Sequence, residues 1–205
     1  MKTTKGLLFI YLLMSIIIIA CTETEPPQFP KYNPINRYSY ILLTDRNTPK
    51  ALAGLSFINT ITGLTYILDT ATKRQDSVDI VYYYGKGNIA TDSNSVASPA
   101  AAVFSNTITT ENPWPELLNW TTRNSTKFKN ISDSLTHDLV DEAQNDSILQ
   151  KYAVNLTDTK INKLKIGSII AFETIKGKKG IFVVENIEGT NAITRLIVIA
   201  MIVQQ

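Results

Sequence analysis

Three adjacent apolar segments lie near the C-terminus. Residues 165–174, 180–187 and 192–203 are rich in isoleucine, valine and phenylalanine, and short glycine-containing turns separate them. Apolar segments joined by short turns predict an antiparallel three-stranded meander. The last segment is almost wholly apolar over residues 196–203, so we expect both of its faces to be covered.

The hydrophobic pattern changes period in the middle of the chain. Residues 78–84 alternate as a strand does, which places Tyr82 and Tyr83 on opposite faces. Residues 132–152 instead show helical spacing at Leu135 and Leu139, with a break and a new helix cap at 145–146. The pattern predicts an α+β fold: an antiparallel sheet with the C-terminal three-stranded meander and one or two helices packed on it.

A continuous apolar run occupies residues 6–20, directly after Lys2 and Lys5. This layout is typical of a secretory signal peptide, and the run is shorter than the ~20 apolar residues of an ordinary spanning helix. Residues 18–21 resemble a bacterial lipobox, in which the chain is cut after a small residue, here Ala20, and the next cysteine, here Cys21, is lipidated. The alternative is a plain signal peptide with an incidental cysteine.

A proline-rich tether follows the signal peptide. Residues 21–35 contain four of the eight prolines, which favours an extended, semi-rigid spacer before a single domain over residues 36–205. Glu23 and Glu25 resemble the export tag of lipoproteins from Bacteroidota-type bacteria, although two acids in a linker are also ordinary solvated charge. Stable anchoring takes more than one acyl chain at ~0.8 kcal/mol per buried methylene, and the resemblance implies two or three chains on Cys21.

The net charge of +2 belongs to the leader. Without residues 1–20 the chain has 18 Lys and Arg against 18 Asp and Glu. A nucleic-acid partner requires a basic face that neutralises phosphates, so a charge-balanced domain argues against one.

Residue types that carry hydrolytic or metal chemistry are scarce. His137 is the only histidine and Cys21 the only cysteine, so the sequence holds no motif that pairs such residues at fixed spacing. Asp76 and Asp79 are close in sequence, but they are predicted on opposite faces, as a turn or solvated strand end rather than a shared centre. We expect no catalytic residue, no metal and no cofactor, and a surface position for His137.

Aromatic residues gather in and beside an irregular segment, residues 88–130. Trp114, Trp120 and Tyr83 are the candidate ligand-binding residues, because flat rings pack on the apolar faces of sugars while amides satisfy the hydroxyls. A glycan-binding role predicts that Trp114 or Trp120 is exposed in a groove. The alternative is that these rings anchor the irregular segment to the core.

Five segments of the mature chain, taken with the lipobox, carry a family resemblance. They are residues 57–66, 78–84, 120–128, 164–174 and 180–184. Together they resemble small outer-membrane lipoproteins of Bacteroidota-type bacteria, domains with no assigned activity. The resemblance implies location and fold, and it brings no catalytic residue with it.

We therefore expect a lipid-anchored protein of the outer membrane, either periplasmic or surface-exposed. The expected role is a non-enzymatic binding or accessory protein at the cell envelope, with the membrane and a glycan or envelope protein as partners. The alternatives are a structural or assembly lipoprotein of an outer-membrane complex, and a hydrolase that uses carboxylates.

Overall fold

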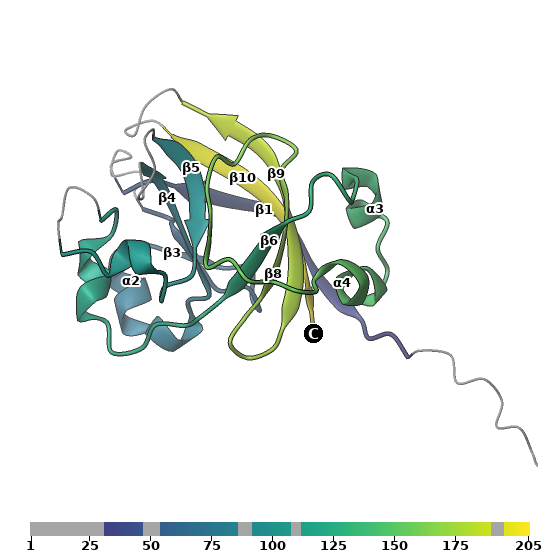
Figure 1. Ribbon diagram of the computed structural model, residues 1–205, viewed down its shortest axis with the longest axis horizontal. Coiled ribbons are helices and arrows are strands. Elements are labelled where there is room, and N and C mark those ends of the chain that lie inside the picture. Colours follow the sequence, from purple (N-terminus) through teal and green to yellow (C-terminus); the bar gives the residue numbers. More distant parts are fainter. Residues whose placement is uncertain (1–30, 47–53, 86–91, 108–111, 190–194) are drawn as a thin grey trace, which may run out of the picture. The chain divides into compact units, whose positions relative to one another are not determined.

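Two antiparallel five-stranded sheets form the folded part of the chain (Figure 1). The computed structural model describes residues 31–46, 54–85, 92–107, 112–189 and 195–205, and the strands belong to one compact unit, Tyr32–Gln205. The first sheet has the order β1-β10-β9-β8-β6 and the second β3-β2-β4-β5-β7. The predicted α+β class is confirmed, with two sheets where one was expected.

The elements follow one another in many short pieces. The first sheet consists of β1 (Ile35–Thr44), β6 (Lys127–Asn130), β8 (Ile169–Glu173), β9 (Lys179–Glu188) and β10 (Leu196–Gln204). The second consists of β2 (Phe57–Ile58), β3 (Thr65–Tyr66), β4 (Ile80–Gly85), β5 (Ser93–Ala97) and β7 (Lys160–Ile161). The helices within the described residues are α2 (Leu68–Lys73), α3 (His137–Asp141) and α4 (Ser147–Tyr152), with 3-10 turns η1 (Gln75–Ser77), η2 (Ala102–Phe104) and η3 (Pro115–Asn119).

The predicted C-terminal meander is confirmed as β8, β9 and β10. Phe182 of β9 pairs with Ile170 of β8 on one side and with Met201 of β10 on the other. The β10 strand also pairs with β1 along its other edge, with Ile199 opposite Ile41. A strand inside a sheet between two packed layers buries both faces, which explains why β10 is almost wholly apolar.

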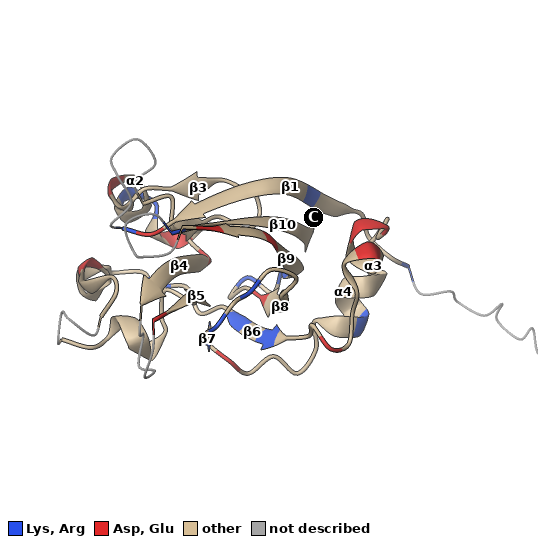
Figure 2. Cartoon of the chain, turned by 90° about the horizontal axis from the view of Figure 1, so that it is seen from above, with Lys and Arg blue, Asp and Glu red and all other residues tan. Residues whose placement is uncertain are grey.

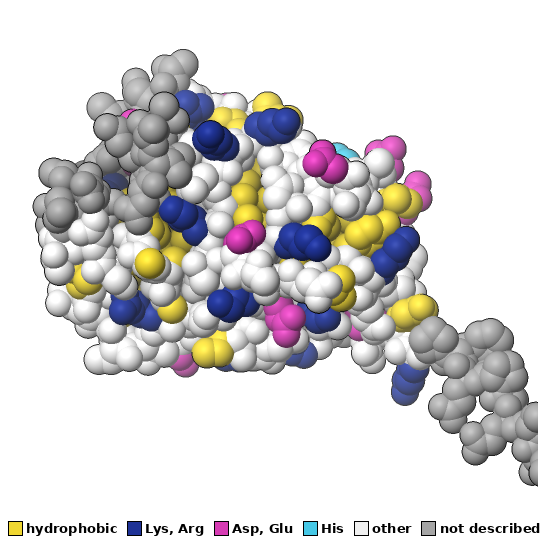
Figure 3. Space-filling view, viewed as in Figure 1, with side chains coloured by type: hydrophobic (Ala, Val, Ile, Leu, Met, Phe, Trp, Pro, Cys, Tyr) yellow, Lys and Arg dark blue, Asp and Glu magenta, His cyan; other side chains and the backbone are white. Residues whose placement is uncertain are grey.

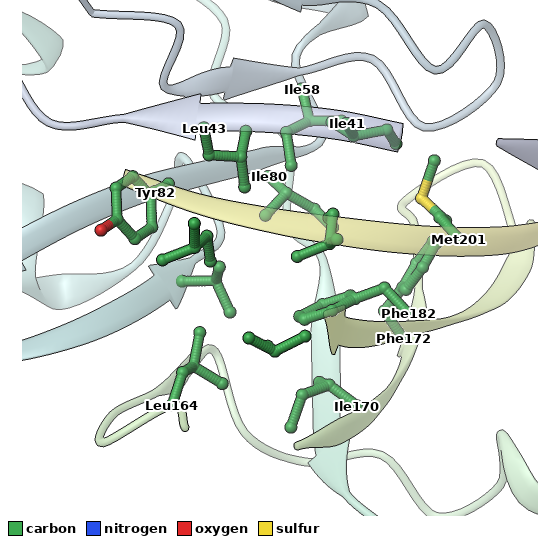
Figure 4. Close-up of a cluster of buried hydrophobic side chains, with 14 of the residues drawn as sticks. Ile41, Leu43, Ile58, Ile80, Tyr82, Leu164, Ile170, Phe172, Phe182 and Met201 are labelled. Carbon is green, nitrogen blue, oxygen red and sulfur yellow. The ribbon is translucent and has the colours of Figure 1, made fainter. Parts of the chain in front are cut away.

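The main core lies between the two sheets (Figure 4). Ile41 and Leu43 of β1 and Phe172 of β8 come from the first sheet, and Ile80 and Tyr82 of β4 come from the second. The contributing positions are two residues apart along each strand, because successive side chains point to opposite faces. Tyr82 and Tyr83 therefore enter different clusters, as their alternation predicts.

Helices α3 and α4 cover the outer face of the first sheet. Val140 of α3 and Leu149 of α4 pack in one cluster with Ile181 and Ile202 of the sheet. Helical spacing was expected to place Leu139 on one stripe with Leu135, but Leu135 is buried and Leu139 is 48% exposed. That prediction is wrong because α3 begins only at His137, so Leu135 lies outside the helix and helical spacing does not relate the two. In the described part of the chain, no helix is long and apolar enough to cross a membrane.

Candidate functional site

The three aromatic candidates lie in a third layer, on the outer face of the second sheet. Trp114 is 2% exposed, Trp120 6% and Tyr83 0%, and all three share one cluster of buried side chains. Phe57 of β2 contacts both indoles, at ring-centroid distances of 4.8 Å to Trp114 and 5.6 Å to Trp120. The expectation of an exposed tryptophan is therefore wrong. The outer face of this sheet must be buried, and the irregular segment supplies the rings that bury it.

The polar atoms of these rings have partners inside the protein. Trp114 Nε1 donates to the backbone oxygen of Tyr82 at 3.1 Å, and Trp120 Nε1 donates to Thr72 Oγ1 at 3.2 Å. The Tyr83 hydroxyl donates to Asn162 Oδ1 at 3.4 Å, and burial raises the pKa of Tyr83 above its ordinary value. Buried aromatic side chains with satisfied polar atoms are typical of structural anchors.

A groove remains beside Trp120, between α2 and η3. We call it the α2–η3 groove; it encloses about 530 Å³ and is lined by Leu68, Asp69, Thr72, Lys73, Glu116, Asn119 and Trp120. A second hollow of about 260 Å³ beside Trp114 shares Leu68 and Asp69 with it. Arg46 lines this second hollow, and its guanidinium lies 2.8 Å from Glu116 Oε1 and 5.1 Å from the centroid of the Trp114 ring. The groove thus presents acceptors, donors and an apolar floor within one small space.

Asp79 is enclosed rather than part of a solvated strand end, so that expectation is wrong. Its side chain is buried, and Oδ2 accepts hydrogen bonds from Thr60 N at 3.1 Å and Thr60 Oγ1 at 2.8 Å. Asn124 Nδ2 donates to Oδ1 at 3.4 Å. Burial raises the pKa of Asp79 above its ordinary value, although these hydrogen bonds act against the rise. The carboxylate joins distant segments, a role that its position in the sequence does not reveal.

His137 lies on the surface, as predicted, and its ring lies against the first sheet. Its Nε2 lies 2.8 Å from Glu185 Oε1 of β9 and 3.3 Å from Asp141 Oδ2 of α3. Arg37 of β1 lies 3.6 Å from Asp141 Oδ1 and donates to the backbone oxygen of Val140 at 3.0 Å. Among the described residues, no group of three or more His, Cys, Asp or Glu side chains has the arrangement to hold a metal ion.

Asp146 holds the start of the folded unit. Its carboxylate accepts hydrogen bonds from Asn33 N at 2.8 Å, Gln150 Nε2 at 3.1 Å and Gln204 Nε2 at 3.0 Å. The break predicted at residues 145–146 is confirmed, because α4 begins at Ser147. Asn145 Oδ1, rather than the Asp146 carboxylate, accepts the N–H of Ser147 at 3.0 Å.

One solved structure has a similar fold. It is a DUF4466 family protein from Parabacteroides merdae, with a TM-score of 0.52 and 13% sequence identity over 83% of this chain. At this identity the likeness shows the fold alone, and the chain spans 54% of that protein's length. No protein-family model matches the chain, and no curated protein matches its sequence.

The remaining two predicted positions, Ala20 and Cys21, lie outside the described residues. The folded unit begins close to the expected domain boundary at residue 36, because β1 starts at Ile35. Sequence reasoning missed the two polar centres at Asp79 and Asp146. Their partners lie far away along the chain, so no local pattern indicates them.

Proposed function

We propose that this protein is an exported lipoprotein, anchored to the outer membrane through Cys21, whose folded unit is a non-enzymatic binding or accessory domain at the cell envelope. The domain is periplasmic or surface-exposed. Its ligand-binding site is the α2–η3 groove, and the ligand is a hydroxyl-rich molecule, a glycan, held by hydrogen bonds and not by the stacking on an exposed tryptophan that the sequence predicts. A groove of mixed polarity at the end of the unit away from the tether carries this proposal.

The position of the groove supports the proposal. Figures 1 and 2 share a horizontal axis, and in both views α2 lies at the opposite end of the unit from α3 and α4. The chain enters the unit beside α4, because Asn33 N donates to Asp146 Oδ1 at 2.8 Å. A lipoprotein held by its N-terminus presents its far end away from the membrane. The α2–η3 groove is at that far end and remains accessible to a ligand.

The chemistry of the lining supports a hydroxyl-rich ligand. Each sugar hydroxyl both donates and accepts a hydrogen bond, so a matching site needs groups of both kinds. Asp69 and Glu116 accept, Lys73 donates, and the Asn119 amide does both. Trp120 lines the groove but is only 6% exposed, so ring stacking contributes less than in a site built on an exposed aromatic face.

Calorimetric titration of the full chain with a panel of oligosaccharides tests the ligand. Asp69→Ala and Asn119→Ala should each weaken binding about five- to thirtyfold, because each removes a hydrogen bond to the sugar worth about 1–2 kcal/mol. Asp158→Ala, at an exposed carboxylate that lines neither hollow, is the matched control and should bind normally. Absence of binding across the panel would refute the glycan role and would favour an envelope protein as the partner.

Metabolic labelling with a palmitate analogue tests the anchor independently. The wild-type chain should incorporate the label and fractionate with membranes, because lipidation requires the thiol of Cys21. Cys21→Ser should lose both properties. A Cys21→Ser chain that still fractionates with membranes would show that another attachment operates. The absence of label in the wild-type chain contradicts the proposed anchoring, whatever the calorimetry shows.

A further inference from the structure

A hollow of about 810 Å³ lies at the other end of the folded unit, between α3, α4 and Tyr32. We call it the α3–α4 groove. Its apolar lining consists of Tyr32, Leu135, Leu139, Ala143, Ile148 and Tyr152. Polar side chains form its rim, among them Glu142, Gln150 and Lys151. The groove therefore has an apolar floor and a polar border, the arrangement of a surface that contacts an amphipathic partner.

Two large apolar side chains of this groove are open to solvent. Tyr32 is 43% exposed and Leu139 is 48% exposed. A single exposed leucine is ordinary, but here the exposed side chains adjoin a hollow with an apolar floor. Figure 3 shows apolar side chains grouped at this end of the unit, with charged side chains among them. Lys151 Nζ lies 4.8 Å from the centroid of the Tyr152 ring, so a cation is present at the border of the apolar surface.

The groove also marks the place where the tether joins the domain. Asn33 is held to the start of α4, because its N–H donates to Asp146 Oδ1 at 2.8 Å and its oxygen accepts from Asp146 N at 2.9 Å. These bonds hold the backbone directly after Tyr32 beside the groove that Tyr32 lines. The point where the tether enters the domain therefore lies at the apolar surface of the α3–α4 groove.

The length of the tether limits how far this end can be from a membrane. Eleven residue steps separate Cys21 from Tyr32. In extended polyproline geometry, at about 3.1 Å per residue, they span at most ~34 Å. A tether this short also keeps the groove at a high effective concentration near the bilayer, in the millimolar range for short linkers. A contact between the groove and the bilayer that would be too weak to hold an unanchored protein on the membrane is then formed in a substantial fraction of the anchored molecules.

We infer that the α3–α4 groove rests on the lipid surface, with Tyr32 and Leu139 inserted at the level of the headgroups and Lys151 facing lipid phosphate. This inference rests on the proposed anchoring through Cys21. Apolar side chains flanked by a lysine are typical of surfaces that lie in the membrane interface. The contact would orient the domain so that the α2–η3 groove faces away from the bilayer.

Site-specific fluorescence quenching tests this contact on the lipidated chain. Lipidation consumes the Cys21 thiol, the only one in the sequence, so an introduced cysteine carries the only reactive thiol. Leu139→Cys is labelled with an environment-sensitive fluorophore. Leu64→Cys is the matched control, since Leu64 is also an exposed leucine, at 55%, but lies beside β3 of the other sheet. Both proteins are reconstituted into phosphatidylethanolamine–phosphatidylglycerol vesicles that contain a nitroxide-labelled lipid.

The expected result is several-fold stronger quenching at position 139 than at position 64. Equal quenching at the two positions, in protein that floats with the vesicles, would overturn the inference and leave the anchor intact. A fluorophore at 139 that is shielded from water without vesicles would indicate a second copy of the chain in the groove and would also overturn it. Failure of either protein to float would contradict the anchor and, with it, the contact.

Discussion

Asp146 determines how firmly the start of the folded unit is held, and its substitution is the most direct test of this structure. The carboxylate is 0% exposed. Besides the bonds from Asn33 N, Gln150 and Gln204, it accepts one from Asn33 Nδ2 at 3.4 Å. Its four donors come from the chain entry, from α4 and from β10. Asp146→Asn keeps the shape of the side chain but replaces an acceptor oxygen with an NH₂ group that faces donors.

The expected loss of free energy of unfolding depends on which of the four donors can find new hydrogen-bond partners. Gln150 and Gln204 are not fully buried and can turn toward water. The backbone N–H of Asn33 cannot turn in this way, and in the variant it meets either the NH₂ group or a neutral amide oxygen in place of a carboxylate. Hydrogen bonds to charged groups contribute about 1.5–3 kcal/mol, against about 0.5–1.5 kcal/mol for neutral ones. We expect Asp146→Asn to lower the free energy of unfolding at neutral pH by about 1–2 kcal/mol.

The pH dependence gives a second, independent readout. Burial alone would raise the pKa of Asp146, but the hydrogen bonds from Asn33, Gln150 and Gln204 lower it below the ordinary value of 3.8. A carboxylate with a lowered folded-state pKa stabilises the protein fully above pH 3.8, and this contribution is lost as the pH falls through the folded-state pKa. The difference in stability between the wild-type chain and Asp146→Asn should therefore be full at pH 7 and should shrink below about pH 4.

Urea unfolding of the two chains at several pH values measures this difference. Asp133→Asn, at an exposed carboxylate between β6 and α3, serves as the control and should change stability by less than about 0.5 kcal/mol. An Asp146→Asn variant as stable as the control variant at neutral pH would contradict the stabilising role of this carboxylate. A difference that persists undiminished at acid pH would contradict its lowered pKa.

Two further substitutions test the cores. Gly180→Ala places a Cβ 2.8 Å from the Ile202 oxygen and against the Phe172 ring, and should cost about 1–3 kcal/mol in urea unfolding. Gly85→Ala meets nothing within 4 Å and should cost less than about 0.5 kcal/mol, so equal losses would contradict the packing. Asp79→Ala leaves the buried Thr60 N–H without its acceptor and should cost about 2–4 kcal/mol; a loss below 1 kcal/mol would show that this centre contributes little.

The sequence by itself determined the parts of the fold that depend on neighbours along the chain. The C-terminal meander follows from three apolar segments joined by short turns, and the opposite placement of Tyr82 and Tyr83 follows from strand alternation. The break before α4 follows from the polar pair at residues 145–146. Each of these is a local property, because the period of a strand or the chemistry of a turn acts over a few residues.

The tertiary structure decided what covers each surface. An apolar strand must be buried, but its own pattern does not name the partner. The pairing of β1 with β10 joins residues that lie more than 150 positions apart, and β6 extends the meander from far upstream. The division into two sheets follows from such pairings, which the local pattern leaves open.

The same reason explains the outcome for the candidate site. The sequence singled out Trp114 and Trp120 as large aromatic rings in an irregular segment, but their exposure depended on whether the second sheet had another cover. Its outer face has none in the described residues except this segment and α2, so the rings are buried there. Exposed Leu139 and the groove beside it arise from where α3 begins and how α4 packs. Burial is a property of the assembled layers, and a pattern of residue types can indicate only that a side chain is suited to it.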